Sequence, residues 1–129
     1  MKHALRLLFV AAVVAGATAS PLAHHPFSAT YATDRQITID GVVVELAYRN
    51  PHAFIHVSAP DRDGQMRRWA VEWGHPGTDR RQGVPTDVLK LGDRLVVTGS
   101  PARDPGAFRI LGRTIVRSSD GWRWAGQAL

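Results

Sequence analysis

Five histidines follow the N-terminal segment of this chain, and they are its most versatile candidate ligands. They stand at positions 24, 25, 52, 56 and 75. Imidazole is a common ligand of transition metals and titrates near neutral pH. The chain contains no cysteine, which excludes thiolate metal sites, cysteine nucleophiles and disulfides. A metal site in this protein would therefore be built from histidine, with carboxylates in support.

The pair His24 and His25, in "AHHPF", has two readings that depend on where the mature chain begins. If His24 is the first residue, its α-amine and imidazole form a chelate for Cu(II), an ion that favours nitrogen ligands in a planar array. A third nitrogen from His25, His52 or His75 would complete the set. If Ser20 is first, the chelate does not exist, and the exposed pair has only incidental affinity for metals.

The elements around these histidines decide which carboxylate can join them. "HAFIHVSA" (52–59) and "MRRWAVEW" (66–73) predict two strands of a hairpin, joined by the turn "DRDGQ". Matching their apolar faces predicts three facing pairs: Ala53 with Trp73, Ile55 with Val71, and Val57 with Trp69. The outer face then carries both histidines of the first strand, and Glu72 lies opposite Phe54.

This register makes His52 and Glu72 the most credible pair on the outer face. Glu72 is diagonal to His52 and to His56, about 7–8 Å away between backbones. The two histidines are about 13 Å apart along a straight strand, so they cannot share one ion. His75 follows Gly74 and could come near His52. The alternative is that Glu72 and the histidines are simply solvated or hydrogen-bonded to one another.

The remaining pattern predicts an all-β fold. Strands are expected at 36–50, 94–102 and 108–118, with a bulge at Gly41, where the alternation changes phase. "TDVLKLGD" (86–93) predicts one short helix between strands 3 and 4, and Trp122 and Trp124 are expected to pack back on the sheet. This order is typical of a small five-stranded OB-like barrel. An open antiparallel sheet or a small sandwich is the alternative.

Residues 1–23 are typical of a signal peptide. A charged start with Lys2 and Arg6 precedes a wholly apolar run, 7–15, which is too short to span a bilayer. Cleavage after Ala19 fits the small-x-small rule better than cleavage after Ala23. The mature part, 24–129, is expected to be a single domain with an N-terminal arm at 24–35. The expected location is periplasmic or secreted, without membrane insertion after cleavage.

The charge and the motifs argue against several function classes. Removing Lys2 and Arg6 lowers the net charge from +5 to +3, with no block of basic residues, so nucleic-acid binding is not expected. The serines lack the strand–turn–helix context of a nucleophile elbow, and no glycine-rich phosphate loop is present. We therefore expect a protein that is not an enzyme.

Four stretches together resemble a family of small secreted bacterial proteins, a domain of unknown function: "AHHPF", "NPHAFIHV", "WAVEWGHP" and "LKLGDRLVVTGSPARD". Its members carry His-His-Ser-Phe after the signal, then Asn-Pro-His and Trp-x-x-Glu. This chain departs from the pattern at Pro26 and His75. The resemblance favours cleavage after Ala23 and implies no known reaction. The matching positions are His24, His25, Phe27, Asn50, Pro51, His52, Trp69, Glu72, Gly74, Pro76, Gly92 and Asp93.

The sequence leads to two functional hypotheses. The first is a periplasmic binding protein that holds a transition metal, copper first, with the arm folded over the outer face of the hairpin. The second is an interaction module in which Tyr48, Phe54 and Trp122 bind an unknown periplasmic partner protein or a sugar. In the first hypothesis His24, His25 and His52 hold the metal, Glu72 is either a ligand or a residue that supports the ligands, and His75 is a further candidate.

Overall fold

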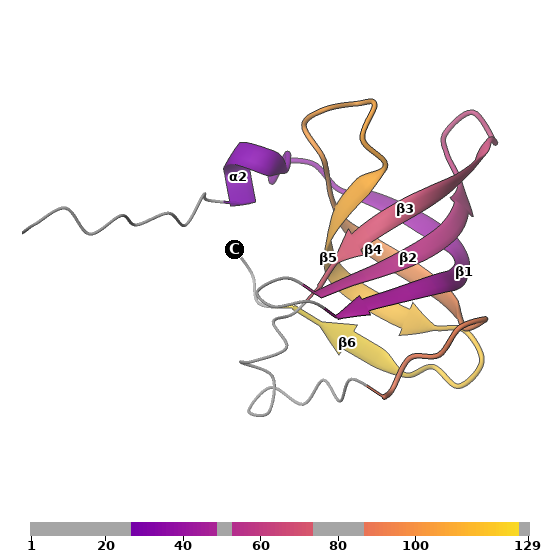
Figure 1. Ribbon diagram of the computed structural model, residues 1–129. Coiled ribbons are helices and arrows are strands. Elements are labelled where there is room, and N and C mark those ends of the chain that lie inside the picture. Colours follow the sequence, from indigo (N-terminus) through magenta and orange to yellow (C-terminus); the bar gives the residue numbers. More distant parts are fainter. Residues whose placement is uncertain (1–26, 49–52, 74–86, 127–129) are drawn as a thin grey trace, which may run out of the picture.

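The computed structural model describes residues 27–48, 53–73 and 87–126 (Figure 1). One short helix, α2 (Phe27–Thr30), precedes the strands. The predicted signal peptide lies outside the described residues. Within the described ranges, no helix is long and apolar enough to cross a membrane. The strands are β1 (Ile37–Tyr48), β2 (Ala53–Pro60), β3 (Met66–Glu72), β4 (Arg94–Pro101), β5 (Arg109–Arg117) and β6 (Arg123–Ala125).

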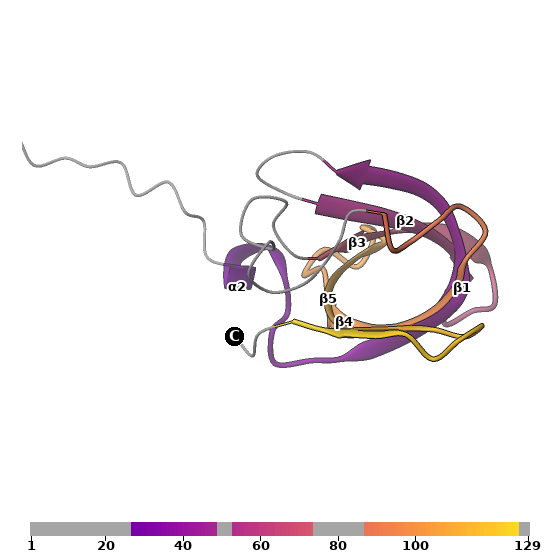
Figure 2. The same ribbon diagram turned by 90° about the horizontal axis from the view of Figure 1, so that it is seen from below.

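The strands form one sheet that closes on itself as a barrel. The order is β3-β2-β1-β4-β5-β6, and an additional parallel pairing of β3 with β5 completes a ring of five strands. Figure 2 shows this ring from one end, with β6 as an extra strand beside β5. The all-β barrel predicted from the sequence is confirmed, and the alternatives of an open sheet or a sandwich are wrong.

The β2–β3 hairpin has the predicted register. Ile55 pairs with Val71, Val57 with Trp69, and Phe54 with Glu72. Alternate residues of β2 are buried, as the pattern predicts for a strand with one face toward a core. Trp124 also packs against this core, with its ring 5.5 Å from that of Trp73. The packing predicted for the C-terminal tryptophans is therefore confirmed.

The bend of β1 is not where the sequence analysis put it. The register shifts between Val43 and Glu45, and Val42 and Val44 remain exposed instead of facing the core. Gly41 serves a different purpose: a Cβ there would lie 2.2 Å from the carbonyl oxygen of Ser58. Glycine is required at this position because β1 and β2 approach closely, not because the strand bulges.

The helix predicted between strands 3 and 4 is wrong over its described part. Residues 87–93 form turns, and the short helix of the fold is α2, in the N-terminal arm. The Asp93 carboxylate accepts from the backbone N–H of Lys90 at 2.9 Å, and Gly92 has φ of 88°. The N–H of Gly92 donates to Val43 of β1 at 2.9 Å. The backbone N–H groups of Lys90 and Gly92 thus bond to the Asp93 side chain and to β1, and not to the carbonyls of a helix.

Candidate functional site

A buried polar cluster joins the N-terminal arm to β3 and β5. The Tyr31 hydroxyl donates to Glu72 Oε2 and accepts from Arg109 Nε at 2.6 Å. Arg109 Nη2 donates to the same Glu72 oxygen at 2.9 Å. Glu72 is 4% exposed and Tyr31 only 1%. We call these three residues the Glu72 cluster.

Each member of the Glu72 cluster is positioned by backbone pairing. Glu72 ends β3 opposite Leu111, and Arg109 begins β5 two residues earlier, so the parallel pairing makes the two side chains diagonal neighbours. Tyr31 forms an isolated bridge with Ala102 just after β4. The next residue, Ala32, donates its N–H to Pro101 at 2.9 Å. The closed barrel and the docked arm thus bring together residues from three distant parts of the chain.

The cluster stabilises an ionised carboxylate and a neutral phenol side by side. Burial raises the pKa of the Tyr31 hydroxyl, and the hydrogen bond to Glu72 raises it further. Burial alone would lower the pKa of Arg109, but its hydrogen bonds to Glu72 and Tyr31 outweigh that effect and raise it. Both shifts favour a neutral Tyr31 phenol and a charged Arg109 guanidinium in the folded protein.

Aromatic rings extend the cluster toward the hairpin and the arm. The Arg109 guanidinium lies 4.8 Å from the centre of the Phe54 ring and 5.4 Å from that of Tyr31. Phe27 of α2 packs against Tyr31, with 6.4 Å between ring centres. The arm is thus fixed to the outer face of the barrel from Phe27 onward.

The described part of the arm is fixed by contacts with β4, β5 and the loop between them. Arg103 donates its backbone N–H to Thr30 at 3.0 Å and its Nε to Ser28 at 2.6 Å. Arg113 of β5 donates to the Thr33 carbonyl at 2.8 Å. The arm therefore runs beside β4 and β5, and within the described residues its Tyr31 hydroxyl is the group that reaches β3.

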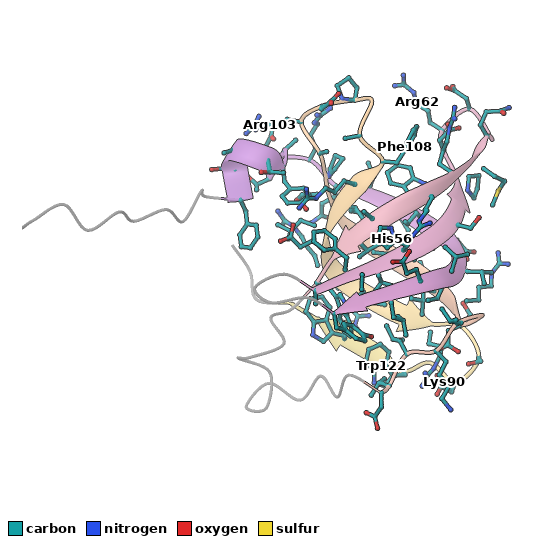
Figure 3. All side chains as sticks on the ribbon, in the orientation of Figure 1. His56, Arg62, Lys90, Arg103, Phe108 and Trp122 are labelled. Atoms are coloured by element: carbon teal, nitrogen blue, oxygen red, sulfur yellow. The ribbon has the colours of Figure 1, made fainter. Side chains whose placement is uncertain are left out.

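Among the predicted site residues, Glu72 lies where the register put it, opposite Phe54. It is buried in the cluster and not solvated. Trp69 faces the core and is 8% exposed. His56 lies on the outer side of β2 (Figure 3), and burial lowers its pKa. The other predicted positions lie outside the described residues: His24, His25, Asn50, Pro51, His52, Gly74, His75 and Pro76.

Within the described ranges, no group of three or more His, Cys, Asp or Glu side chains is arranged to hold a metal ion. The aromatic side chains proposed for an interaction module already have partners in the fold. Phe54 lies beneath Arg109, Tyr48 packs 6.3 Å from Trp73, and Trp122 lies beneath Arg117 at 5.7 Å.

Tyr31 and Arg109 were not predicted as site residues from the sequence. A signal for Arg109 was present in "FRILGRTIVR", where arginine recurs every fourth residue in an otherwise apolar strand. Buried or half-buried charges need partners, so such arginines predict anchoring contacts. In the structure, Arg113 and Arg117 also bind segments outside β5. Tyr31 has no comparable signal in its local sequence.

A second feature is a hollow at the end of the barrel where β2 turns into β3. It has a volume of about 800 Å³ and lies between the 61–65 turn, the 102–108 loop and the start of β1. Trp69 and Phe108 line it with apolar surface, and their rings meet edge to face at 5.3 Å. Figure 3 shows Arg62, Phe108 and Arg103 at this end of the barrel.

A family model described as a family of unknown function (DUF6152) matches residues 11–109. No curated protein matches the chain. The match covers most of the chain, including β1 to β4 and the first residue of β5.

Proposed function

The chain belongs to the DUF6152 family, whose function is unknown, and we propose from its own residues that it is an exported metal-binding protein. It binds one transition metal ion, copper before others, and turns over no substrate. The ligands are the α-amine and imidazole of His24, with His25 and His52, and His75 is the further candidate. Nitrogen ligands of this kind suit Cu(II).

Three chain segments that adjoin these histidines meet on one side of the barrel, and this juxtaposition carries the proposal. Ala53, directly after His52, accepts a hydrogen bond from the N–H of Trp73 at 3.1 Å. His75 comes two residues after Trp73. Ala53 and Trp73 are therefore the described residues from which the chain continues to His52 and to His75.

The arm brings the third segment to the same side. Tyr31 is bonded to Glu72, the residue before Trp73. The Tyr31 N–H also donates back to the Phe27 carbonyl at 2.7 Å, which fixes the turn of α2. His25 stands only two residues before Phe27. The hydrogen bond between Tyr31 and Glu72 therefore fixes the described part of the arm beside β3, a few residues after the N-terminal histidines.

Glu72 supports this site as an anchor. Its carboxylate accepts from Tyr31 and Arg109 and so ties the arm to β3 and β5. We therefore assign Glu72 the role of holding the arm beside the histidines.

We also propose that the barrel is OB-like. Its five strands close in the order β1-β2-β3-β5-β4, and β1 is long and bent. In OB barrels the face of strands 2 and 3 is the usual binding surface. That face here carries Phe54, His56 and Glu72. Export to the periplasm is supported by the charged start and the short apolar run before residue 24.

Calorimetric titration of the mature protein with Cu(II) tests the proposal. We expect one ion per chain with a Kd below about 1 μM, and a loss of at least about tenfold in affinity in His24→Ala and in His52→Ala. His56→Ala is the matched control, because this histidine lies on the same face but outside the ligand set, and its affinity should stay unchanged. Weak binding of the wild type, or equal losses in all three variants, would contradict the proposal.

A further inference from the structure

We propose that the hollow at the β2–β3 turn is a second binding site, and that it takes a small organic anion with an apolar body. It lies at the opposite end of the β2–β3 hairpin from Ala53 and Trp73. The described residues that line it include no histidine. This inference is independent of the metal proposal.

The size and the walls of the hollow fit a small molecule. Ligand sites in proteins are hollows of about 300–1,000 Å³, mostly apolar, with a few polar groups that fix orientation. At about 800 Å³ this one lies within that range. Half of its lining is apolar or aromatic, and three prolines stiffen it: Pro60, Pro101 and Pro105.

The apolar surface is held in place by the core. Trp69 is 8% exposed, and its ring supports that of the half-buried Phe108. Phe108 also lies under the Arg67 guanidinium, 4.9 Å from the ring centre. A flat apolar group entering the hollow would meet a wall that is already ordered, which lowers the entropic cost of binding.

The aspartates around the hollow are mostly engaged by the protein itself. Asp61 is bound by Arg67 at 2.9 Å and by two backbone N–H groups of its own turn. Asp40 pairs with Arg94 at 3.0 Å. Asp104 accepts from the N–H of Gly106 at 2.9 Å. Asp63 is the remaining aspartate of the lining.

The arginines of the rim retain more unused hydrogen-bonding capacity. The side chains of Arg35 and Arg62 make no hydrogen bond or ion pair within the described part of the chain. Arg103 uses its Nε for the Ser28 carbonyl, and its two terminal nitrogens make no hydrogen bond within the described part of the chain. Guanidinium groups bind carboxylates and related anions through paired N–H donors. The rim therefore favours an anionic group over a cationic one.

Dye binding tests this assignment on the mature protein in the presence of a chelator. The probes are anilinonaphthalene sulfonate, an aromatic anion, and phenylnaphthylamine, its uncharged counterpart. We expect saturable binding of one sulfonate per chain and at least tenfold weaker binding of the neutral dye. Non-saturable binding, or equal affinity for both dyes, would overturn the proposal.

Two variants locate the site. The double variant Arg35→Gln/Arg62→Gln should weaken sulfonate binding about tenfold, because it removes the two unpaired guanidinium groups. Arg123→Gln is the matched control: Arg123 is an exposed arginine on β6 that does not line the hollow. Circular dichroism of both variants checks that the barrel is intact. Equal effects of the double variant and the control would place the dye elsewhere and contradict the proposal.

Discussion

Two arginines of β5, eight residues apart, use the same chemistry in different surroundings. Arg109 binds the buried Glu72 and Tyr31 and so holds the N-terminal arm. Arg117 binds Asp120 through two hydrogen bonds, of 3.0 and 2.8 Å, and also contacts Asp93 at 3.2 Å. The carboxylate side chain is 5% exposed in the first case and 52% exposed for Asp120 in the second.

This difference in exposure should decide what each contact contributes. A carboxylate in water loses little when its partner is removed, because solvent replaces the partner. When one member of a buried ion pair is removed, water cannot replace it, and the remaining member keeps an uncompensated charge. The Arg109 contact with Glu72 is therefore expected to contribute more to holding the arm than the Arg117 contact with Asp120 contributes to the turn that leads to β6.

Glu72→Gln should have the largest effect on stability. The change keeps the shape but leaves Arg109 without its counter-charge, and we expect a loss of about 2–3 kcal/mol in the free energy of unfolding. Urea denaturation measures this directly. Glu45→Gln is the control, since Glu45 pairs with Arg68 at the surface and is 45% exposed. Equal losses of unfolding free energy in the two variants would contradict the claim that the buried pair contributes more than the exposed one.

Tyr31→Phe should come next. It deletes one hydroxyl that donates to Glu72 and accepts from Arg109, and we expect a loss of about 1–2 kcal/mol. The other tyrosine of the chain provides a matched control. The Tyr48 hydroxyl is buried and has no hydrogen-bond partner among the described residues, so Tyr48→Phe should be neutral or slightly stabilising. A larger loss in Tyr48→Phe than in Tyr31→Phe would contradict this assignment.

The pH dependence of stability tests the contribution of Tyr31 to the Glu72 cluster. Burial and the bond to Glu72 raise the pKa of Tyr31 above its ordinary value near 10. The stability it contributes is complete below pH 10 and is lost as the pH rises further, because the unfolded chain then releases a proton that the folded chain retains. Melting temperatures measured between pH 8 and 12 should fall less steeply in Tyr31→Phe than in the wild type. Identical slopes would show that Tyr31 is not linked to folding.

Asp120→Asn should have the smallest effect. The hydrogen bonds from Arg117 hold the pKa of Asp120 at about 2, so its contribution is present above about pH 4 and is lost as the pH falls toward 2. We expect a change in melting temperature at pH 7 that is smaller than that of Tyr31→Phe, and a smaller difference from the wild type at pH 2 than at pH 7. A loss at pH 7 as large as that of Glu72→Gln would show that exposure does not decide the effect.

The parts of the fold that depend on local patterns were predictable. The alternation in β2 and β3 gave their register residue by residue, because one apolar face must meet another. The bulge in β1 was misplaced because Gly41 has two explanations, and the close approach of Ser58 is visible only in three dimensions. The helix at 86–93 was wrongly predicted because bonds from this segment to β1 do not follow from its own residues.

The candidate site was predictable only in part. The outer-face position of Glu72 follows from the hairpin, but its burial depends on Tyr31 and Arg109, which are 41 and 37 residues away. Those contacts arise from the parallel closure of β3 with β5 and from the docking of the arm. The spacing of the β5 arginines predicts anchoring contacts but not which residues they bind, and the docking of the arm leaves no pattern in the local sequence.

The most direct test of the account is the intact mass, under native conditions, of the protein exported to the periplasm of an expression host and exposed to copper. We predict a chain that begins at His24 and retains one copper ion, and a Tyr31→Phe variant that retains less under the same conditions. A chain that begins at Ser20 and carries no copper would contradict the proposal that a latched N-terminal arm presents its histidines to a metal.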